Sequence, residues 1–158
     1  MLMLTKLSEL STLLNAPAVV SGWLTITQSQ INQFAQATLD PQWIHVDVEK
    51  AKGGPFGSTI AHGFLTLSLI PYFFESSILI KEQGMGVNYG LNKVRFTSPV
   101  LVNSELRAHF ELIELQQIGH DGVQVNWAVK IERKGTEKMV CIAETIARYY
   151  PSKGDSIL

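Results

Sequence analysis

The hydrophobic residues of this chain recur with a helical period near its start and with a strand period in its second half. Leucines at helical spacing predict a short amphipathic helix over residues 6–15. A first strand is expected over residues 19–27. From residue 87 onwards apolar and polar positions alternate, which is typical of half-buried strands. The four strands expected there cover residues 87–96, 106–112, 123–131 and 139–150.

A second helix is expected over residues 28–39. Thr27 and Gln30 stand at the spacing of a capping box, in which two side chains satisfy the first free N–H groups of a helix. Asp40 and Pro41 end this helix, because the residue before a proline is disfavoured in the α region.

The most apolar segment runs from Ile60 to Ile80, where most positions are apolar. It predicts a long helix over residues 61–81, kinked at Pro71. Its length approaches that of a membrane span, but Glu75 lies within it, and a charge in the bilayer costs at least ~2.5 kcal/mol. We therefore expect a helix buried in a globular core, against the face of an antiparallel sheet. This order of elements predicts an α+β fold.

Length and composition describe one globular domain over residues 1–158, with a helical extension over 1–17 and a loose tail over 152–158. The formal net charge is −1 and the mean hydropathy is +0.12, which favours neither nucleic acid nor a membrane as partner. Cys141 is the single cysteine, so an intrachain disulfide and a multi-cysteine zinc site are excluded. The segment over 1–14 lacks the pattern of a signal peptide. We expect a cytoplasmic protein.

The densest polar cluster follows the second predicted helix, in the segment from Asp40 to Asp47. Asp40 and His45 lie close together in the sequence and can converge on one water if the loop folds back. Such a pair supplies a base near neutral pH and a second group that orients or protonates. In the alternative interpretation, Asp40 caps or turns the chain and His45 is a surface imidazole. The residues alone leave both interpretations open.

This region also resembles two other kinds of site. His45, Asp47 and His62 resemble a set of iron ligands, but the gap before the second histidine is shorter than in such sites, so no metal is expected. The glycine loop over residues 53–57 is similar to a phosphate-binding loop. No Lys-Ser or Lys-Thr pair follows its last glycine, so it lacks the order of a P-loop. A sharp turn into the apolar helix is the simpler explanation.

The start of the apolar helix offers free backbone donors. Its first N–H groups have no partner within the helix, so they can bind an oxyanion or a carbonyl. Gly63 has no side chain to block an approaching carbonyl. Alternatively, Gly63 only eases close packing, and His62 is a first-turn or packing histidine. We take Gly63 and His62 as candidate oxyanion and substrate-binding residues.

Together these motifs resemble those of the MaoC-like dehydratases, or (R)-specific enoyl-CoA hydratases. The resemblance rests on residues 40–45, on the glycine loop and on the run Ile60-Ala61-His62-Gly63-Phe64-Leu65. The run Gln42-Trp43-Ile44-His45-Val46-Asp47 is similar to the branch of that family named after nodulation protein N. The similarity extends through residues 95–100 and covers most of the chain from residue 21 to residue 150.

The resemblance implies a hot-dog fold, in which an antiparallel sheet wraps around a long central helix, and a homodimer joined at the sheet edges. It implies that Asp40 and His45 activate a water and that the Gly63 N–H polarises a thioester carbonyl. The implied reaction adds or removes water across the 2,3-double bond of an acyl thioester. No metal or redox cofactor is implied, because coenzyme A or an acyl-carrier arm arrives with the substrate.

Two other functions stay open. Leu39 stands where the family pattern has glycine, and Pro41 follows Asp40, so stiffer residues flank the aspartate. A re-aimed carboxylate, low hydratase activity or a non-catalytic protein that binds acyl thioesters would each fit this departure. The spacing of Asp40 and His45 is kept, so the enzyme remains our interpretation. The other alternative is a hot-dog thioesterase, which places an acidic residue on the long helix, where Glu75 is the candidate.

Overall fold

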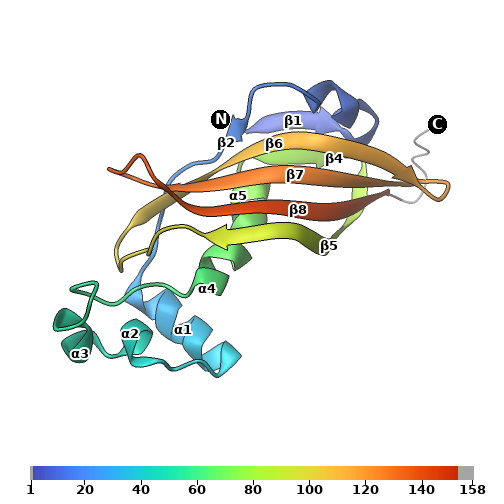
Figure 1. Cartoon of the computed structure of the whole chain (residues 1–158). Coiled ribbons are helices and arrows are strands. Elements are labelled where there is room, and N and C mark those ends of the chain that lie inside the picture. The colour runs from blue at the N-terminus through green and yellow to red at the C-terminus, as the bar shows by residue number, and fades with distance from the viewer. Residues whose placement is uncertain (1, 153–158) are drawn as a thin grey trace.

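A six-stranded antiparallel sheet, curved around two short helices, makes up most of the structure (Figure 1). The structure is a computed structural model and describes residues 2–152. The strands are β2 Val19–Val20, β3 Leu24–Thr25, β5 Gln83–Phe96, β6 Glu105–Ile118, β7 Gly122–Arg133 and β8 Met139–Pro151. Their order is β2-β6-β7-β8-β5, and β3 also pairs with β6. The four strands predicted from the alternating pattern are therefore confirmed, and each is longer than expected.

The alternating pattern arises because one face of the sheet is buried. The buried side chains of β6 are Leu106, Ala108, Phe110 and Leu112, and the residues between them face outwards. Gly119 and Gly135 lie in the two hairpin turns with φ of 59° and 81°, a conformation that glycine adopts without a steric penalty. These turns join β6 to β7 and β7 to β8.

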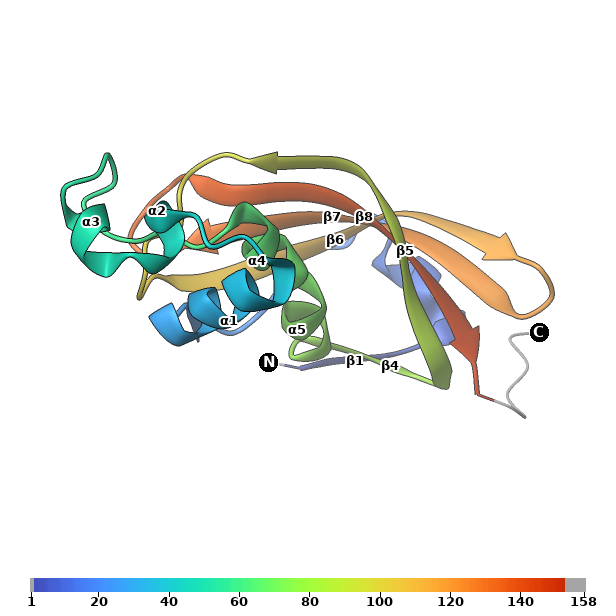
Figure 2. The same cartoon turned by 90° about the horizontal axis from the view of Figure 1, so that it is seen from below.

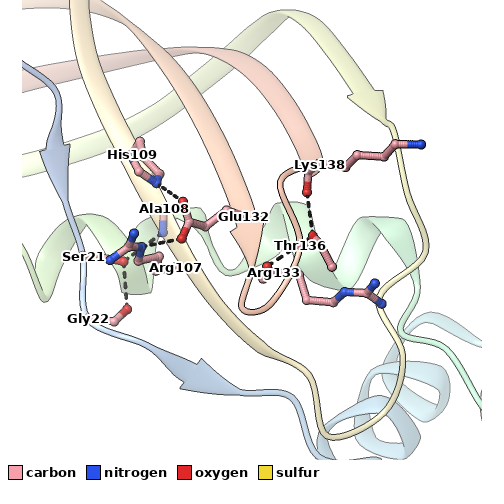
Figure 3. Close-up of polar contacts among 9 residues, drawn as sticks. All are labelled: Ser21, Gly22, Arg107, Ala108, His109, Glu132, Arg133, Thr136 and Lys138. Atoms are coloured by element: carbon pink, nitrogen blue, oxygen red, sulfur yellow. Dashed lines mark hydrogen bonds and ion pairs between the residues drawn. The ribbon is translucent and has the colours of Figure 1, made fainter.

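The strand predicted over residues 19–27 is present only as the short strands β2 and β3, so that prediction was partly wrong. Ser21, Gly22 and Trp23 separate the two. The Ser21 hydroxyl accepts a hydrogen bond from the Ala108 N–H at 2.9 Å and donates one to the Gly22 carbonyl at 3.0 Å (Figure 3). A side chain thus replaces a backbone carbonyl in the pairing with β6, and regular pairing resumes at Leu24.

The apolar segment predicted as one long helix forms two helices and a strand, so the prediction of a helix through residue 81 was wrong. These elements are α4 Gly63–Ser68, α5 Ile70–Glu75 and β4 Ile78–Lys81. Pro71 lies in the first turn of α5, where a missing N–H removes no helical hydrogen bond. The Ser77 hydroxyl donates to the Phe73 carbonyl at 2.6 Å just after the helix ends. Ile78 and Ile80 then alternate with an exposed leucine, as in a half-buried strand.

The two helices nevertheless lie where the central helix was expected, under the curve of the sheet (Figure 2). Phe74 of α5 contacts Phe110, Trp127 and Tyr149 of three different strands, with ring centroids 5.2–6.3 Å apart. Aromatic contacts of this kind supply a large share of the buried apolar area of a small core. None of the helices within residues 2–152 is long and apolar enough to cross a membrane.

The N-terminal extension is only partly helical, which corrects the prediction for residues 1–17. Strand β1 Met3–Lys6 pairs in parallel with β4, and a 3₁₀-helix, η1 Leu7–Leu13, follows it. Leu7 and Leu10 anchor this segment in the core. Of the predicted tail over 152–158, Ser152 is described and donates its N–H to the Glu82 carbonyl at 2.8 Å. Residues 153–158 lie outside the described residues.

Three further helices gather at one end of the sheet, beside the start of α4 (Figures 1 and 2). They are α1 Gln28–Thr38, α2 Trp43–Val46 and α3 Val48–Lys52. The predicted capping box of α1 is confirmed: Gln30 donates its N–H to the Thr27 hydroxyl, and the Gln30 side chain accepts from the Thr27 N–H at 2.9 Å. The glycine loop connects α3 to the segment that leads into α4.

Candidate active site

Asp40 directly follows α1 and is held by the end of that helix. Leu39 adopts the left-handed conformation, with φ 59° and ψ 34°, and thereby ends α1. This conformation costs a non-glycine residue roughly 1–2 kcal/mol. The Asp40 N–H donates to the Ala35 carbonyl at 3.0 Å, which is the usual hydrogen bond of such a helix end. Leucine thus reproduces the turn for which glycine is the favoured residue, and the Asp40 carboxylate, with 56% of the side chain exposed, reaches solvent.

His45 lies on α2 and is buried, which excludes the surface imidazole considered above. Its Nδ1 lies 2.7 Å from the Ile60 carbonyl oxygen. A carbonyl only accepts, so Nδ1 carries the hydrogen and the lone pair is on Nε2. The Gln28 side-chain amide donates to the His45 carbonyl at 2.7 Å, and the Thr59 hydroxyl donates to the same Gln28 side chain. These bonds fix both the backbone and the ring of His45.

Backbone hydrogen bonds hold the segment that carries Ile60 between α2 and the connection from β5 to β6. Ile60 donates its N–H to the Ile44 carbonyl at 3.0 Å, and Ala61 donates to the Val100 carbonyl at 2.8 Å. Soon afterwards the chain enters α4 at Gly63. These backbone hydrogen bonds therefore hold the start of α4 close to α2.

Asp40, His45 and His62 lie close together beside the start of α4, although Asp40 and His62 belong to different segments of the chain. A carboxylate oxygen of Asp40 and one ring nitrogen of each histidine lie within 4.8 Å of one another. A water that donates or accepts two hydrogen bonds of about 2.8 Å spans about 4.6 Å between its partners. One water can therefore bridge Asp40 and His45. The loop does fold back as the catalytic interpretation required.

The surroundings of His45 favour its neutral form. Burial lowers the pKa of His45 below its ordinary value of 6.5, and the neighbouring His62 lowers it further. The hydrogen bond to the Ile60 carbonyl and the Asp40 carboxylate act in the opposite direction but do not outweigh burial. Neutral imidazole is the form that can take a proton from water near pH 7.

The geometry does not suit a metal ion. The rings of His45 and His62 are stacked, with centroids 3.7 Å apart and an angle of 23° between the planes. Nitrogen lone pairs lie in the ring planes, so a Zn²⁺ ion at about 2.0–2.1 Å from both nitrogens would lie outside both planes. Asp47, the carboxylate of the metal pattern considered in the sequence, instead accepts the Lys50 N–H at 2.9 Å at the start of α3. Asp40, His45 and His62 thus offer three ligand atoms within 4.8 Å of one another, but the two stacked rings are poorly oriented to share one ion.

Gly63 begins α4, and its N–H has no hydrogen-bond acceptor within residues 2–152. A Cβ placed on Gly63 would lie 2.6 Å from Cδ2 of Phe96 on β5. Phe96 in turn makes an edge contact with Phe64, with centroids 5.6 Å apart. The packing interpretation of Gly63 is therefore correct, and it is compatible with a role of the same residue's N–H as a donor.

The other chemically active residues have structural explanations. His109 and Arg107 both contact the Glu132 carboxylate on the outer face of the sheet, at 2.6 and 2.7 Å (Figure 3). Those two hydrogen bonds overcome the effect of burial and lower the pKa of Glu132. Burial raises the pKa of the Cys141 thiol to about 11, so it stays protonated and unreactive at neutral pH.

Sequence reasoning missed several residues that complete the site. Gln28 and Thr59 connect α1 to the backbone of His45, and Phe34 contacts the His62 ring with centroids 5.0 Å apart. Phe96 lies against Gly63. None of these residues belongs to a polar cluster in the sequence. Only the position of Phe34 on the apolar side of α1 indicated that it would be turned inwards.

A cavity of about 770 Å³ lies one helical turn beyond Gly63, between the two central helices and the sheet. Its walls come from α4, α5, β4 and the sheet strands β5, β6, β7 and β8. The lining includes Leu67, Phe74, Leu91, Trp127 and Tyr149. A volume in the range of about 300–1,000 Å³ with mostly apolar walls is typical of small-molecule sites.

Comparison with known proteins agrees with this geometry. Residues 11–134 match the family model described as a MaoC like domain. The chain is 49% identical over 129 residues to the 3-hydroxyacyl-thioester dehydratase Z of Mycobacterium tuberculosis (strain ATCC 25618 / H37Rv), covering 82% of this chain and 85% of that protein. It is 43% identical over 136 residues to nodulation protein N of Rhizobium leguminosarum bv. viciae, covering 84% of each.

The fold also matches a solved structure, the (R)-hydratase from A. caviae involved in PHA biosynthesis. The TM-score is 0.64 at 19% identity, with 84% of this chain and 96% of that chain covered. This likeness confirms the predicted α+β hot-dog fold. Since the family model covers most of the chain and both relatives exceed 40% identity, the chain belongs to the MaoC-like dehydratase family, whose general class of activity is that of a hydro-lyase.

Proposed function

We propose that the protein catalyses the reversible hydration of a 2,3-unsaturated acyl thioester to the (R)-3-hydroxyacyl thioester. The observation that carries this proposal is the meeting of Asp40 and His45 within reach of one water, beside the free N–H of Gly63. Similarity to the mycobacterial 3-hydroxyacyl-thioester dehydratase supports the same class of substrate.

The three groups match what the reaction requires. The water oxygen bonds to C3 while the Asp40–His45 pair takes its proton. Electrons of the double bond move towards the thioester carbonyl, and the Gly63 N–H stabilises the negative charge that develops on that oxygen. C2 then receives a proton from the same pair, which restores the starting protonation state. Dehydration is the same sequence in reverse.

The substrate carries its own handle in this proposal. Coenzyme A or an acyl-carrier arm holds the acyl group as a thioester, and the chain itself contributes no metal or redox group to the steps above. In this proposal the acyl chain extends past Gly63 into the apolar cavity, whose lining begins one helical turn further along α4 at Leu67. We place this reaction in the cytoplasm, where a lone free thiol such as that of Cys141 is usual.

Turnover of crotonyl-CoA tests the proposal directly. We expect the purified protein to convert it to the 3-hydroxyacyl thioester, measured by loss of the conjugated enoyl absorbance, without release of free thiol. Enoyl-CoA esters of increasing chain length then show how much of the cavity is used. Thiol release would instead indicate a thioesterase, and tight acyl-CoA binding without turnover of any ester would indicate a binding protein.

The structure disfavours the thioesterase. Glu75, the acidic residue considered for it, is the last residue of α5 and is exposed. Gly63 begins α4, so the whole length of both helices separates the two residues along the chain. Glu75 lies in the wall of the apolar cavity and does not belong to the cluster of Asp40, His45 and His62. This position does not favour Glu75 as a group that acts on a carbonyl bound at the Gly63 N–H.

We further propose that the protein is a homodimer joined along β5. This strand is the last in the sheet order, so its outer edge has no partner within residues 2–152. Its exposed hydrophobic residues are Met85, Val87, Tyr89, Leu91 and Phe96. A long exposed edge with apolar side chains readily pairs with another strand, and a second copy supplies the same edge.

The dimer can be tested by sedimentation or light scattering. We expect a mass twice the 17.5 kDa of the single chain. The double substitution Val87→Lys/Leu91→Lys should give monomers, because it places like charges opposite one another across the shared edge. Ile113→Lys, an exposed residue of the interior strand β6, is the matched control and should leave the dimer intact. A monomeric wild-type protein would disprove the proposal.

A further inference from the structure

His62 is a buried imidazole that contacts both members of the Asp40–His45 pair. Only 3% of its surface is exposed. One face of its ring is stacked on His45, and its Nε2 lies 3.0 Å from the main-chain oxygen of Asp40. The same nitrogen is 3.9 Å from the Asp40 carboxylate, beyond hydrogen-bond distance. Phe34 packs against the ring at 5.0 Å.

These contacts show which nitrogen of His62 acts as a donor. Because Nε2 faces a carbonyl oxygen, Nε2 carries a hydrogen and donates it. Nδ1 is buried and has no hydrogen-bond partner among the described residues. A buried polar atom without a partner costs about 1–3 kcal/mol. A phenyl ring would fill the same space without that cost, so the imidazole is explained by its donor to Asp40 rather than by its shape.

The donor matters because little else holds Asp40. Its side chain is half exposed, so the position of the carboxylate depends on the backbone. The N–H of Asp40 is held by the Ala35 carbonyl and its carbonyl by His62. The bond to His62 therefore fixes the far side of a residue whose neighbours are a strained leucine and a proline.

The stacking of His62 on His45 helps to fix the orientation of the His45 ring. The hydrogen bond from Nδ1 to Ile60 fixes the direction of the His45 ring but allows rotation about that bond. The stacked His62 ring at 3.7 Å restricts this rotation and so fixes the direction of the Nε2 lone pair of His45.

We propose that His62 is a positioning residue, which holds the Asp40 backbone and the His45 ring at a separation that one water bridges, and which neither gives nor takes a proton in the reaction. This role rests on the proposed hydratase function. It differs from the substrate contact expected of His62 in the sequence, because the buried ring points at the catalytic pair.

Three substitutions separate the two contacts of His62. His62→Phe keeps a ring to stack on His45 and removes the donor, His62→Gln keeps an N–H donor and removes the ring, and His62→Ala removes both. We expect kcat for crotonyl-CoA to fall about 10–100-fold in His62→Phe and His62→Ala, because displacements of about 1 Å have effects of this size. KM should change less than about threefold. His62→Gln should recover at least part of the loss.

The pH profile distinguishes positioning from a general loss of packing. Asp40 and His62 are the titratable groups that influence His45, and His62 lowers its pKa. Removing the imidazole should therefore raise the pKa of His45 and move the acidic limb of kcat/KM to higher pH. His120→Phe is the matched control, since it makes the same change at an exposed histidine in the turn between β6 and β7 and should leave kcat and the acidic limb unchanged.

Several results would overturn the proposal. One is a wild-type kcat in His62→Phe, and another is an acidic limb that does not move. A third is the loss of a second ionisation from the pH profile of every His62 variant, because this would show that His62 itself acts as an acid or base.

If the wild-type protein hydrates no thioester, the proposed function fails. In that case NMR titration of His45 still decides the role of His62, because an unchanged pKa in His62→Phe would contradict it and a raised pKa would support it.

Discussion

Replacing Asp40 with asparagine is expected to lower kcat for crotonyl-CoA hydration by about 10²–10⁴-fold, the range typical of lost general acid–base catalysis. Asparagine has nearly the same shape as aspartate but cannot take a proton from water. KM should change little, because the Asp40 carboxylate faces the water rather than the acyl chain. Steady-state kinetics over a range of substrate concentrations measure both values.

His45→Asn is expected to cause a loss of similar size. Asparagine is preferred to alanine because its side-chain N–H can keep the hydrogen bond to the Ile60 carbonyl. Leaving that carbonyl buried and unpaired would destabilise the fold by about 1–3 kcal/mol and would obscure the chemical effect. Equal unfolding midpoints for the variant and the wild-type protein would show that the fold is intact.

Asp47→Asn is the matched control for both variants. Asp47 follows His45 closely in the sequence, and its carboxylate caps α3 by accepting the Lys50 N–H. Asparagine caps a helix equally well, so activity and stability should not change. Wild-type rates in both Asp40→Asn and His45→Asn would show that this pair does not carry the reaction.

Gly63→Ala is expected to lower kcat/KM by about 10²-fold, because loss of one donor to the developing negative charge typically raises the barrier by about 2.7–4 kcal/mol. The new methyl group would lie 2.6 Å from Cδ2 of Phe96, closer than real side chains approach one another. Either the Phe96 ring or the start of α4 must move, and movement of α4 displaces the N–H that we propose as the donor to the thioester oxygen. Steady-state kinetics with crotonyl-CoA measure the loss.

A second substitution tests this cause. Phe96→Ala in the Gly63→Ala background removes the clash, so activity should rise at least tenfold over Gly63→Ala alone. Gly22→Ala is the control, because a Cβ there meets no atom within 4 Å and its activity should match the wild type. Full activity of Gly63→Ala would contradict the assignment of its N–H, and failure of the rescue would show that the clash with Phe96 is not the cause.

The strands and the first long helix could be predicted because their signals are local. Alternation along β6 follows from one buried face, and Thr27 with Gln30 forms a cap through bonds between close neighbours in the sequence. The segment after Phe73 shows the limit of this reasoning. Its apolar residues continue through Ile80, and composition does not distinguish a buried helix from a buried strand. The pairing of β4 with β1, a strand from the very start of the chain, decides the difference.

In the candidate site, too, some features could be predicted from neighbouring residues and others depend on tertiary contacts. By itself the sequence predicted that Asp40 and His45 lie close together after a capped helix and that Gly63 lies in the first turn of the next apolar helix, because turn chemistry and helix ends depend on neighbouring residues. Only the tertiary structure decided that His62 stacks on His45, that Gln28 holds the His45 backbone and that Phe96 covers Gly63. These contacts join segments that are distant in the sequence, and their formation depends on how the helices pack against the sheet, which no local period in the sequence records.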